Sequence, residues 1–356
     1  MKPRLKPVGE QVIVITGASS GIGLTTAQMA AAQGACVVLS ARNGSDLQNA
    51  VTGIRRRGGR AIGVVADVAD ATQVEGIAAA AIREFGRMDT WVNCAAVAMY
   101  GRITEIPLED HRRQFDVNYW GHVHGSRTAV THLRANGGAL INVGSCVSDR
   151  AIPLQGTYCA AKHALKAFTD TLRMELQEAG LPISVTLVKP ASIDTPFFDK
   201  ARSYTGKEPQ PVPPVYAPEV VANAILTAAQ RPVRDVITGG AGRMLGISTA
   251  TPVLTDSYME RTLFRSQQTD RPTNGRLDNL YAPVAHDGGR RGRNWTGRTR
   301  ESSVYTAATL HPRRALAAIV GFACAAVSAR FAARALTNRN RRFLKGATGG
   351  PRIRCN

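Results

Sequence analysis

Tyr158 and Lys162 lie four residues apart in the stretch TYCAAKHAL, residues 157–165. On a helix, residues at i and i+4 share one face, so the two side chains would lie side by side. A positive lysine favours the phenolate form of a neighbouring tyrosine, and such a tyrosine can exchange a proton with a carbonyl or alcohol oxygen. Pairs with this spacing are common on helices, so the chemistry depends on what the rest of the chain supplies.

A glycine-rich stretch, TGASSGIG, covers residues 16–23 and follows the apolar run VIVITG. Gly17, Gly21 and Gly23 lie where the chain turns from a strand into a helix, and glycines there let a pyrophosphate approach the backbone. The helix N-terminus behind them offers N–H groups to that anion. Glycines also serve tight packing, but the strand–turn–helix context is the one that a dinucleotide-binding motif requires.

The end of the second apolar run, SAR at residues 40–42, bears on the choice of cofactor. NAD-binding folds usually carry an acidic residue here for the ribose 2′-hydroxyl, whereas an arginine suits a 2′-phosphate. This chain has Arg42 and no carboxylate at that point. We therefore expect NADP(H) to be the preferred cofactor, with NAD(H) as the alternative.

Short apolar runs that alternate with helical stretches must position these residues. Seven runs rich in Val and Ile predict strands, at residues 12–17, 35–42, 61–68, 89–96, 138–145, 183–191 and 234–240. Runs that are apolar throughout are typical of parallel strands buried on both faces. The sequence therefore predicts an α/β fold of the Rossmann type, with a doubly wound parallel sheet of about seven strands and a basic C-terminal helical extension.

Several spaced motifs, taken together, resemble the short-chain dehydrogenase/reductase family over roughly residues 10–240. The resemblance implies a catalytic tetrad of Asn118, Ser145, Tyr158 and Lys162. It also implies cofactor contacts from Gly17, Ser19, Ser20, Gly21, Ile22, Gly23, Arg42, Asp67, Val68, Asn93, Ala95, Tyr158, Lys162, Pro190, Ile193 and Thr195. The chain departs mildly from the family pattern at Cys94, Ala96 and Ala191, and none of these changes removes a polar group from the tetrad.

The resemblance implies an NADP(H)-dependent oxidoreductase that interconverts a carbonyl and a secondary alcohol. Tyr158 would be the acid/base, Ser145 would bind the reacting oxygen, and Lys162 would bind the nicotinamide ribose. Asn118 would support a water that relays protons to Lys162. The segment after Thr195, which forms a substrate lid in this family, is rich in aromatic residues and proline and favours an apolar substrate. The alternative is a non-catalytic NADP(H)-binding sensor or a membrane-tethered scaffold.

The charge of the chain is concentrated in its last fifth. The formal net charge is +19, and residues 286–356 hold 15 of the 45 Lys and Arg residues but only two acidic residues. Aromatic residues are sparse there, so we expect no nucleic-acid partner. The six cysteines show no paired spacing, which favours a reducing compartment, and the N-terminus lacks a signal peptide, so we expect a cytoplasmic protein. His122 and His124 are only two residues apart and have no neighbouring ligand, and no metal site is predicted.

Composition divides the chain into four expected parts. They are a Rossmann-fold NADP-binding catalytic domain at 1–245, a C-terminal elaboration with one helix at 246–285, a flexible Gly/Arg-rich linker at 286–312 and an apolar, basic helix at 313–345. The uncharged run of that last helix is shorter than the roughly 20 residues that span a bilayer. It could lie on an anionic membrane surface, dock on the enzyme or a partner subunit, or act as a marginal anchor. The family resemblance also implies a homodimer or homotetramer.

Overall fold

A computed structural model describes residues 3–285, 288–313 and 315–317 of the chain. Its centre is a seven-stranded sheet in the order β11-β7-β6-β4-β1-β2-β3, and every neighbouring pair is parallel. The strands are β1 (Val12–Thr16), β2 (Cys36–Ala41), β3 (Arg60–Val65), β4 (Thr90–Asn93), β6 (Gly138–Val143), β7 (Ile183–Pro190) and β11 (Asp235–Thr238). This confirms the predicted Rossmann-type sheet and its seven strands.

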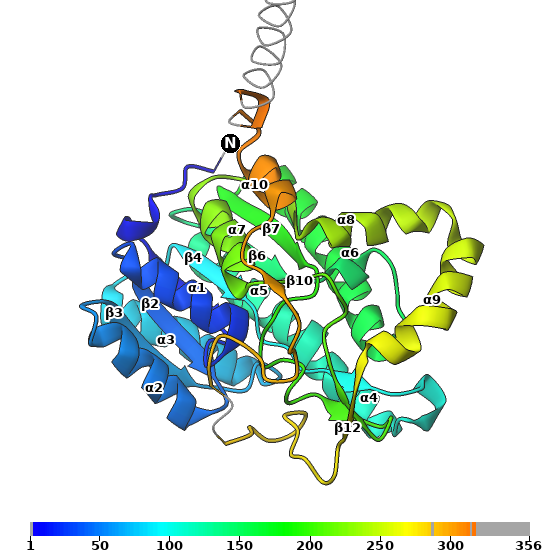
Figure 1. The fold of residues 1–356 in the computed structure, drawn as a ribbon. Helices are drawn as coiled ribbons and strands as arrows, with labels where there is room; N and C mark the ends of the chain where they lie inside the picture. Colours follow the sequence, from blue (N-terminus) through cyan, green and yellow to red (C-terminus); the bar gives the residue numbers. More distant parts are fainter. Residues whose placement is uncertain (1–2, 286–287, 314, 318–356) are drawn as a thin grey trace, which may run out of the picture. The chain divides into compact units, whose positions relative to one another are not determined.

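Helices cover both faces of this sheet (Figure 1). On one face, α1 (Gly21–Ala32) packs against α2 (Gly44–Arg55) and α7 (Pro218–Gln230). On the other face, α3 (Ala71–Phe85) packs against α5 (Gly121–Leu133), and α6 (Gly156–Glu178) lies on β7. Every residue of β1, β4, β6 and β7 is buried, which is why these strands are mostly apolar.

The sheet order reverses between β1 and β4, because the chain builds β2 and β3 on one side of β1 and the later strands on the other. In open parallel sheets, ligands bind in the crevice beyond the carboxyl ends of the strands at such a reversal. The turns after β1, β4 and β6 therefore meet at one edge of the sheet. These turns hold the glycine-rich loop, residues 94–97 and Ser145.

Further helices and short strands complete the part of the chain that the structure describes. The helices are α4 (Leu108–Phe115), α8 (Gly240–Ile247), α9 (Pro252–Ser266) and α10 (Val304–Leu310), with a π-helical turn at Asp116–Trp120 and 3-10 turns at Val8–Glu10, Ile103–Glu105, Cys146–Ser148 and Ser248–Ala250. The short strands are β5 (Met99–Tyr100), β8 (Arg202–Ser203), β9 (Lys207–Pro209), β10 (Val215–Tyr216), β12 (Gln268–Pro272) and β13 (Thr299–Arg300). The predicted helix of the C-terminal elaboration corresponds to α9.

Residues 288–301 are mostly exposed, and backbone hydrogen bonds attach part of this segment to the rest of the domain. Two buried carboxylates, those of Asp194 and Asp199, accept hydrogen bonds from the backbone N–H groups of Gly292, Arg293 and Asn294. Strand β13 then pairs with β10. Backbone groups make these contacts, so the side-chain composition of the segment gives no sign of them.

The chain divides into two compact units, residues 1–306 and 307–356. Most of the helix predicted at 313–345 lies outside the described residues, so its three interpretations stay predictions. Among the residues that are described, no helix is long and apolar enough to cross a membrane.

Candidate active site

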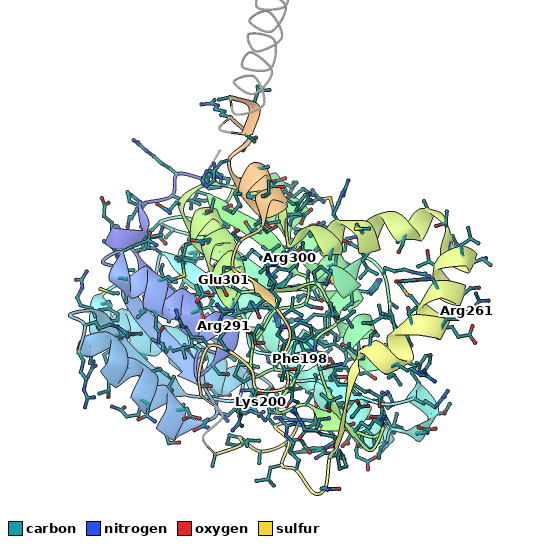
Figure 2. The ribbon with its side chains drawn as sticks, viewed as in Figure 1. Phe198, Lys200, Arg261, Arg291, Arg300 and Glu301 are labelled. Carbon is teal, nitrogen blue, oxygen red and sulfur yellow. The ribbon has the colours of Figure 1, made fainter. Side chains whose placement is uncertain are left out.

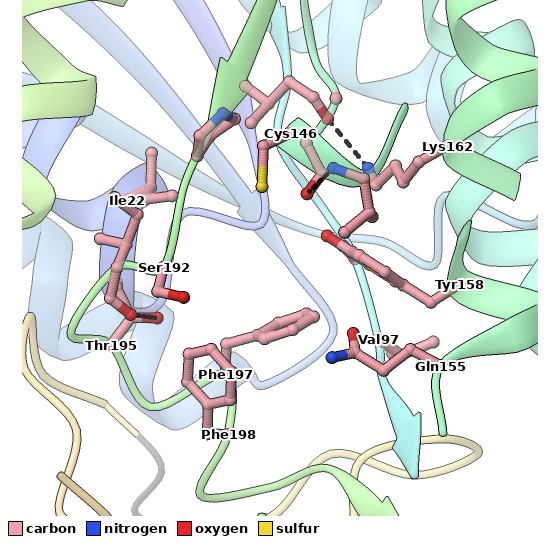
Figure 3. Close-up of a pocket in the computed structure, with 18 of the residues that line it drawn as sticks. Ile22, Val97, Cys146, Gln155, Tyr158, Lys162, Ser192, Thr195, Phe197 and Phe198 are labelled. Carbon is pink, nitrogen blue, oxygen red and sulfur yellow. Dashed lines mark hydrogen bonds between the residues drawn. The ribbon is translucent and has the colours of Figure 1, made fainter. Parts of the chain in front are cut away.

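A cavity of about 660 Å³ opens at the carboxyl edge of the sheet and extends from the glycine-rich loop to α6 and α9. It is lined by most of the residues that the sequence assigns to the site: Gly17, Ser19, Ser20, Gly21, Ile22, Gly23, Arg42, Asp67, Val68, Ala95, Ser145, Tyr158, Lys162, Pro190, Ile193 and Thr195. In Figure 3, Ile22 and Thr195 lie on one side of this cavity, and Tyr158 and Lys162 lie on the other. The fold thus brings the glycine-rich loop and three members of the tetrad to one cavity.

The glycine-rich loop is shaped by positions that accept no side chain. Gly17 has φ +67°, and a Cβ there would lie 2.7 Å from the Cα of Ala95. A Cβ on Gly23 would lie 2.4 Å from the carbonyl oxygen of Gly17. The hydroxyl of Thr16 accepts hydrogen bonds from the N–H groups of Cys94 and Ala95, at 3.0 and 3.2 Å, and joins this loop to the turn after β4. The bare backbone that results is the surface a pyrophosphate requires.

Two predicted site residues do not line the cavity, Asn93 and Asn118. The amide of Asn93 donates to Asn142 Oδ1 at 2.8 Å and accepts from the indole N–H of Trp91 at 2.7 Å. The amide of Asn118 bonds both backbone groups of Val97, at 2.9 and 2.8 Å. Both side chains are fully buried, so their direct contacts in this structure support the turn after β4.

Asn118 lies on the π-helical turn between α4 and α5. Such turns are rare and are frequently found at functional sites. The turn places the Asn118 amide against Val97, which lines the cavity. The predicted water relay to Lys162 stays a prediction.

Ser145 ends the β6 turn and caps the short 3-10 helix Cys146–Ser148. The Ser145 hydroxyl accepts a hydrogen bond from the Val147 N–H at 3.3 Å. The Ser148 hydroxyl accepts one from the N–H of Ser145 at 3.2 Å. These bonds fix the side chain at the cavity wall. The Ser145 hydroxyl also interacts with the phenol of Tyr158, and this interaction favours the phenolate.

Burial dominates the electrostatics of Tyr158 and Lys162. It raises the pKa of Tyr158 well above the usual value, against the lowering influence of Ser145. Burial also lowers the pKa of Lys162 to about 8. The Lys162 ammonium donates to the Val143 carbonyl at 2.9 Å and lies 5.8 Å from the centre of the Tyr158 ring. Burial therefore sets the direction of the Tyr158 pKa shift in the chain by itself, and Ser145 is the group that opposes it.

The low pKa of Lys162 predicts a pH dependence of stability. Between about pH 8 and 10.5 the unfolded chain would hold a proton on Lys162 that the folded chain has lost, so stability should rise with pH in that window. We expect the free energy of unfolding of the wild type, relative to Lys162→Met, to rise by about 2–3 kcal/mol from pH 7.5 to 10. Urea unfolding at a series of pH values measures this difference, and a difference that stays constant with pH would contradict it.

Arg42 and Asp67 lie at the other end of the cavity. An oxygen of the Asp67 carboxylate lies 2.5 Å from Arg113 Nη2 and 3.8 Å from Arg42 Nη1. Burial alone would raise the pKa of Asp67, but hydrogen bonds from the Ala69 N–H and from Arg113 and the charge of Arg42 together hold that pKa below its usual range. This end of the cavity therefore carries the Arg42 guanidinium and the ionised Asp67 carboxylate, to which Arg113 is bound from outside the lining.

Sequence reasoning missed several residues of the cavity. Lys200 donates to the hydroxyl of Ser20 at 2.8 Å, and Asn279 and Pro283 line the wall beside Arg42. Two thiols, those of Cys94 and Cys146, also line the wall, and burial raises their pKa values to about 12 and about 11. Lys200, Asn279 and Pro283 lie in no recognisable motif, and Asn279 is 237 residues from Arg42.

Comparisons of the sequence and the fold with known proteins identify the family of this chain. The family described as short chain dehydrogenase matches residues 11–206, more than half of the chain. A Bacillus subtilis (strain 168) protein named "Uncharacterized oxidoreductase YxnA" is 45% identical over 336 residues, which are 92% of this chain and 93% of that protein. The chain therefore belongs to the short-chain dehydrogenase/reductase family and is an oxidoreductase of that type.

Two further similarities concern named activities. The 11-beta-hydroxysteroid dehydrogenase A of Sesamum indicum is 36% identical over 190 residues, which are 53% of this chain and 54% of that protein. A solved alcohol dehydrogenase from Thermococcus sibiricus, complexed with 5-hydroxy-NADP, superposes with a TM-score of 0.56 at 25% identity. It covers 64% of this chain and 95% of that one.

Proposed function

We propose that this protein is an NADP(H)-dependent oxidoreductase that interconverts a carbonyl and a secondary alcohol on an apolar substrate. The observation that carries the proposal is the single cavity shared by the glycine-rich loop and the side chains of Ser145, Tyr158 and Lys162. The Thermococcus sibiricus neighbour, complexed with a modified NADP, supports the choice of cofactor. The cavity reaches from the cofactor loop to the acid/base pair, as a hydride transfer between a dinucleotide and a small molecule requires.

The residues present fit a dinucleotide. Side chains at Gly17 and Gly23 would collide with the backbone, which leaves the loop bare at the place where a pyrophosphate would lie. Asp67 and Val68 would bound the adenine, Arg42 would meet a 2′-phosphate, and Ile193 and Thr195 lie on the nicotinamide side. When bound, the nicotinamide supplies or accepts the hydride.

The chain's own groups handle the proton and hold the substrate. Tyr158 would donate a proton to the carbonyl oxygen during reduction and take it back during oxidation. Ser145 would donate a hydrogen bond to the same oxygen. Lys162, charged and buried, would favour the phenolate and bind the nicotinamide ribose. Asn118 would act through the backbone of Val97 as a positioning residue.

The substrate end of the cavity is apolar. The ring of Phe197 lies 5.7 Å from that of Tyr158, and Phe198 packs edge-on against Phe197 at 5.5 Å (Figure 3). Ile152, Val212, Leu245, Leu254 and Leu263 add aliphatic surface. The charged side chains among the described lining residues are Arg42, Asp67, Lys162 and Lys200. An apolar ketone or alcohol suits this wall better than a charged substrate.

Cofactor titration tests this proposal directly. Fluorescence titrations of the wild type are expected to show NADPH binding about 10- to 100-fold more tightly than NADH, the value of one or two charge-assisted hydrogen bonds. In Arg42→Ala, NADPH affinity should fall to the level of NADH, while NADH affinity should change much less. Equal affinities of the wild type for NADPH and NADH would overturn the preference for NADP(H). A separate screen of apolar ketones with NADPH would test the reaction itself.

The proposal includes a homodimer or homotetramer. Trp120, at the end of the π-helical turn, is 48% exposed. A large apolar side chain left open beside α6 supports an interface there. Light scattering of the wild type and of Trp120→Glu would test this, with a shift towards the monomer expected for the variant. A location in the cytoplasm or on a membrane surface stays a prediction.

A further inference from the structure

The C-terminal chain returns over the cofactor end of the cavity. We use "strap" for its two described stretches, residues 278–285 and 288–294. Figure 1 shows this part of the chain, in yellow and orange, as a long excursion after α9 that comes back across the first half of the domain. Asn279 and Pro283 of the strap line the same cavity as Arg42 and Asp67. The cavity therefore continues beneath the strap, which is part of its wall.

Backbone carbonyl groups of the first stretch bind side chains at the end of the cavity proposed for the adenosine. Arg42 donates to the carbonyl oxygens of Asn279, Leu280 and Tyr281, the last at 3.0 Å. Arg113 donates to the Leu280 carbonyl at 3.0 Å. The amide of Asn43, next to Arg42, donates to the carbonyl of Val284 at 2.8 Å. Side chains from the end of β2 and from α4 thus bind one short run of backbone.

The second stretch lies on the glycine-rich loop itself. The N–H of Gly21, the first residue of α1, donates to the carbonyl oxygen of Gly289 at 2.8 Å, and Ser20 pairs with Gly289 as an isolated β-bridge. Three residues further on, Gly292 donates through its N–H to Asp194 at 3.1 Å. The strap therefore crosses directly over the loop where a pyrophosphate would bind.

Buried charges fasten the far end of the second stretch. Asp199, which is 5% exposed, accepts the N–H groups of both Arg293 and Asn294. Arg291 forms ion pairs with Glu219 at 3.2 Å and with Glu301 at 2.7 Å. Figure 2 shows Arg291 and Glu301 along this returning chain. One buried carboxylate and a set of partly exposed ion pairs thus hold this end of the strap.

We propose that the strap is a gate of the cofactor site, which must detach from the glycine-rich loop and from Arg42 before a dinucleotide can enter or leave. The inference rests on the proposed dinucleotide binding and adds that the C-terminal extension controls the rates of exchange. With the strap closed, the dinucleotide would lie in the cavity that Asn279 and Pro283 help to line. Opening breaks the bonds at Gly289, Asn279, Leu280 and Tyr281.

An engineered disulfide can hold the gate shut. A Cβ on Gly288 would lie 3.4 Å from the Cβ of Asp46, close to the spacing of a disulfide. Neither residue lines the cavity. In the double variant Asp46→Cys/Gly288→Cys, stopped-flow fluorescence would follow the binding of NADPH and of NADH before and after reduction with dithiothreitol. The wild type and both single variants, treated identically, control for the native cysteines.

We expect the oxidised double variant to bind NADPH at least 10-fold more slowly than the same sample after reduction. Protein loaded before oxidation should release NADPH more slowly by a similar factor. Equal rates in both forms, or a failure of the two thiols to join, would overturn the gate. Binding of neither dinucleotide by the reduced variant and the wild type would overturn the proposed function and the gate together.

A second variant opens the gate instead of closing it. Asp199→Asn replaces one of the two oxygens that accept from Arg293 and Asn294 with a donor, so that end of the strap should loosen. Association and dissociation of NADPH are both expected to become several-fold faster, with a smaller change in Kd. If Asp199→Asn bound and released NADPH at the wild-type rates, the gate would be contradicted. A slower exchange in the disulfide variant would then reflect distortion of the protein.

Discussion

Tyr158→Phe is expected to lower kcat for carbonyl reduction by at least about 10³-fold while leaving the fold and the binding of the dinucleotide intact. The variant removes one hydroxyl, the group proposed to transfer the proton, and general acid/base groups of this kind contribute about 10²- to 10⁴-fold. The ring itself still packs against Phe197. Steady-state kinetics with NADPH, together with a cofactor titration, separate the loss of chemistry from any loss of binding.

Tyr100→Phe provides the matched control. Tyr100 is fully buried near Tyr158, but its hydroxyl has no hydrogen-bond partner and does not line the cavity. Removal of this hydroxyl deletes the same atom without touching the proposed proton path. We expect nearly unchanged turnover and equal or slightly higher stability, since a buried unpaired hydroxyl is costly. A Tyr158→Phe enzyme that kept more than a tenth of the wild-type kcat would contradict the role of Tyr158 and revive the non-catalytic alternative.

Gly125→Ala is expected to lower the free energy of unfolding by about 2–4 kcal/mol. A Cβ on Gly125 would lie 2.1 Å from the Oδ1 of Asn93 and 2.8 Å from the indole nitrogen of Trp91. The methyl group would therefore overpack the core and separate the Trp91–Asn93 hydrogen bond, which is fully buried. Overpacking costs about 1–3 kcal/mol, and a buried polar group left unpaired costs a similar amount.

Gly76→Ala makes the same chemical change where there is room for it. Gly76 is exposed in the middle of α3, and nothing lies within 4 Å of the Cβ that it would gain. Alanine is favoured over glycine in a helix interior by about 0.5–1 kcal/mol, so this variant should be stabilised. Urea denaturation of both variants measures the contrast. A Gly125→Ala protein as stable as Gly76→Ala would mean that the buried network tolerates a methyl group at that point.

The sheet and the main chemistry could be predicted from sequence because their signals are local. Strands such as β1 and β6 are buried throughout, so unbroken apolar runs mark them. The glycine-rich loop is marked by residues that close backbone contacts demand, at Gly17 and Gly23. Tyr158 and Lys162 share a helix, so their proximity follows from spacing alone.

The rest depends on tertiary contacts that leave no pattern in the sequence. The strap is held largely by its own carbonyl and N–H groups, which every residue type carries, so the composition of these residues gives no sign of the contacts. Asn93 lies in the expected place, but its amide is used by Trp91 and Asn142, and only the pairing of β4 with β6 shows this. The raised pKa of Tyr158 reflects its complete burial, which the motif does not encode.

The thiols of Cys94 and Cys146 have a consequence for the kinds of carbonyl compound that the cavity can hold. With pKa values of about 12 and about 11, fewer than roughly one in ten thousand of these groups is ionised at pH 7. The thiolate is the nucleophile in additions to electron-poor double bonds, and here it is almost absent. An α,β-unsaturated ketone that reached this wall would therefore meet two neutral thiols, which add to such double bonds far more slowly than thiolates do.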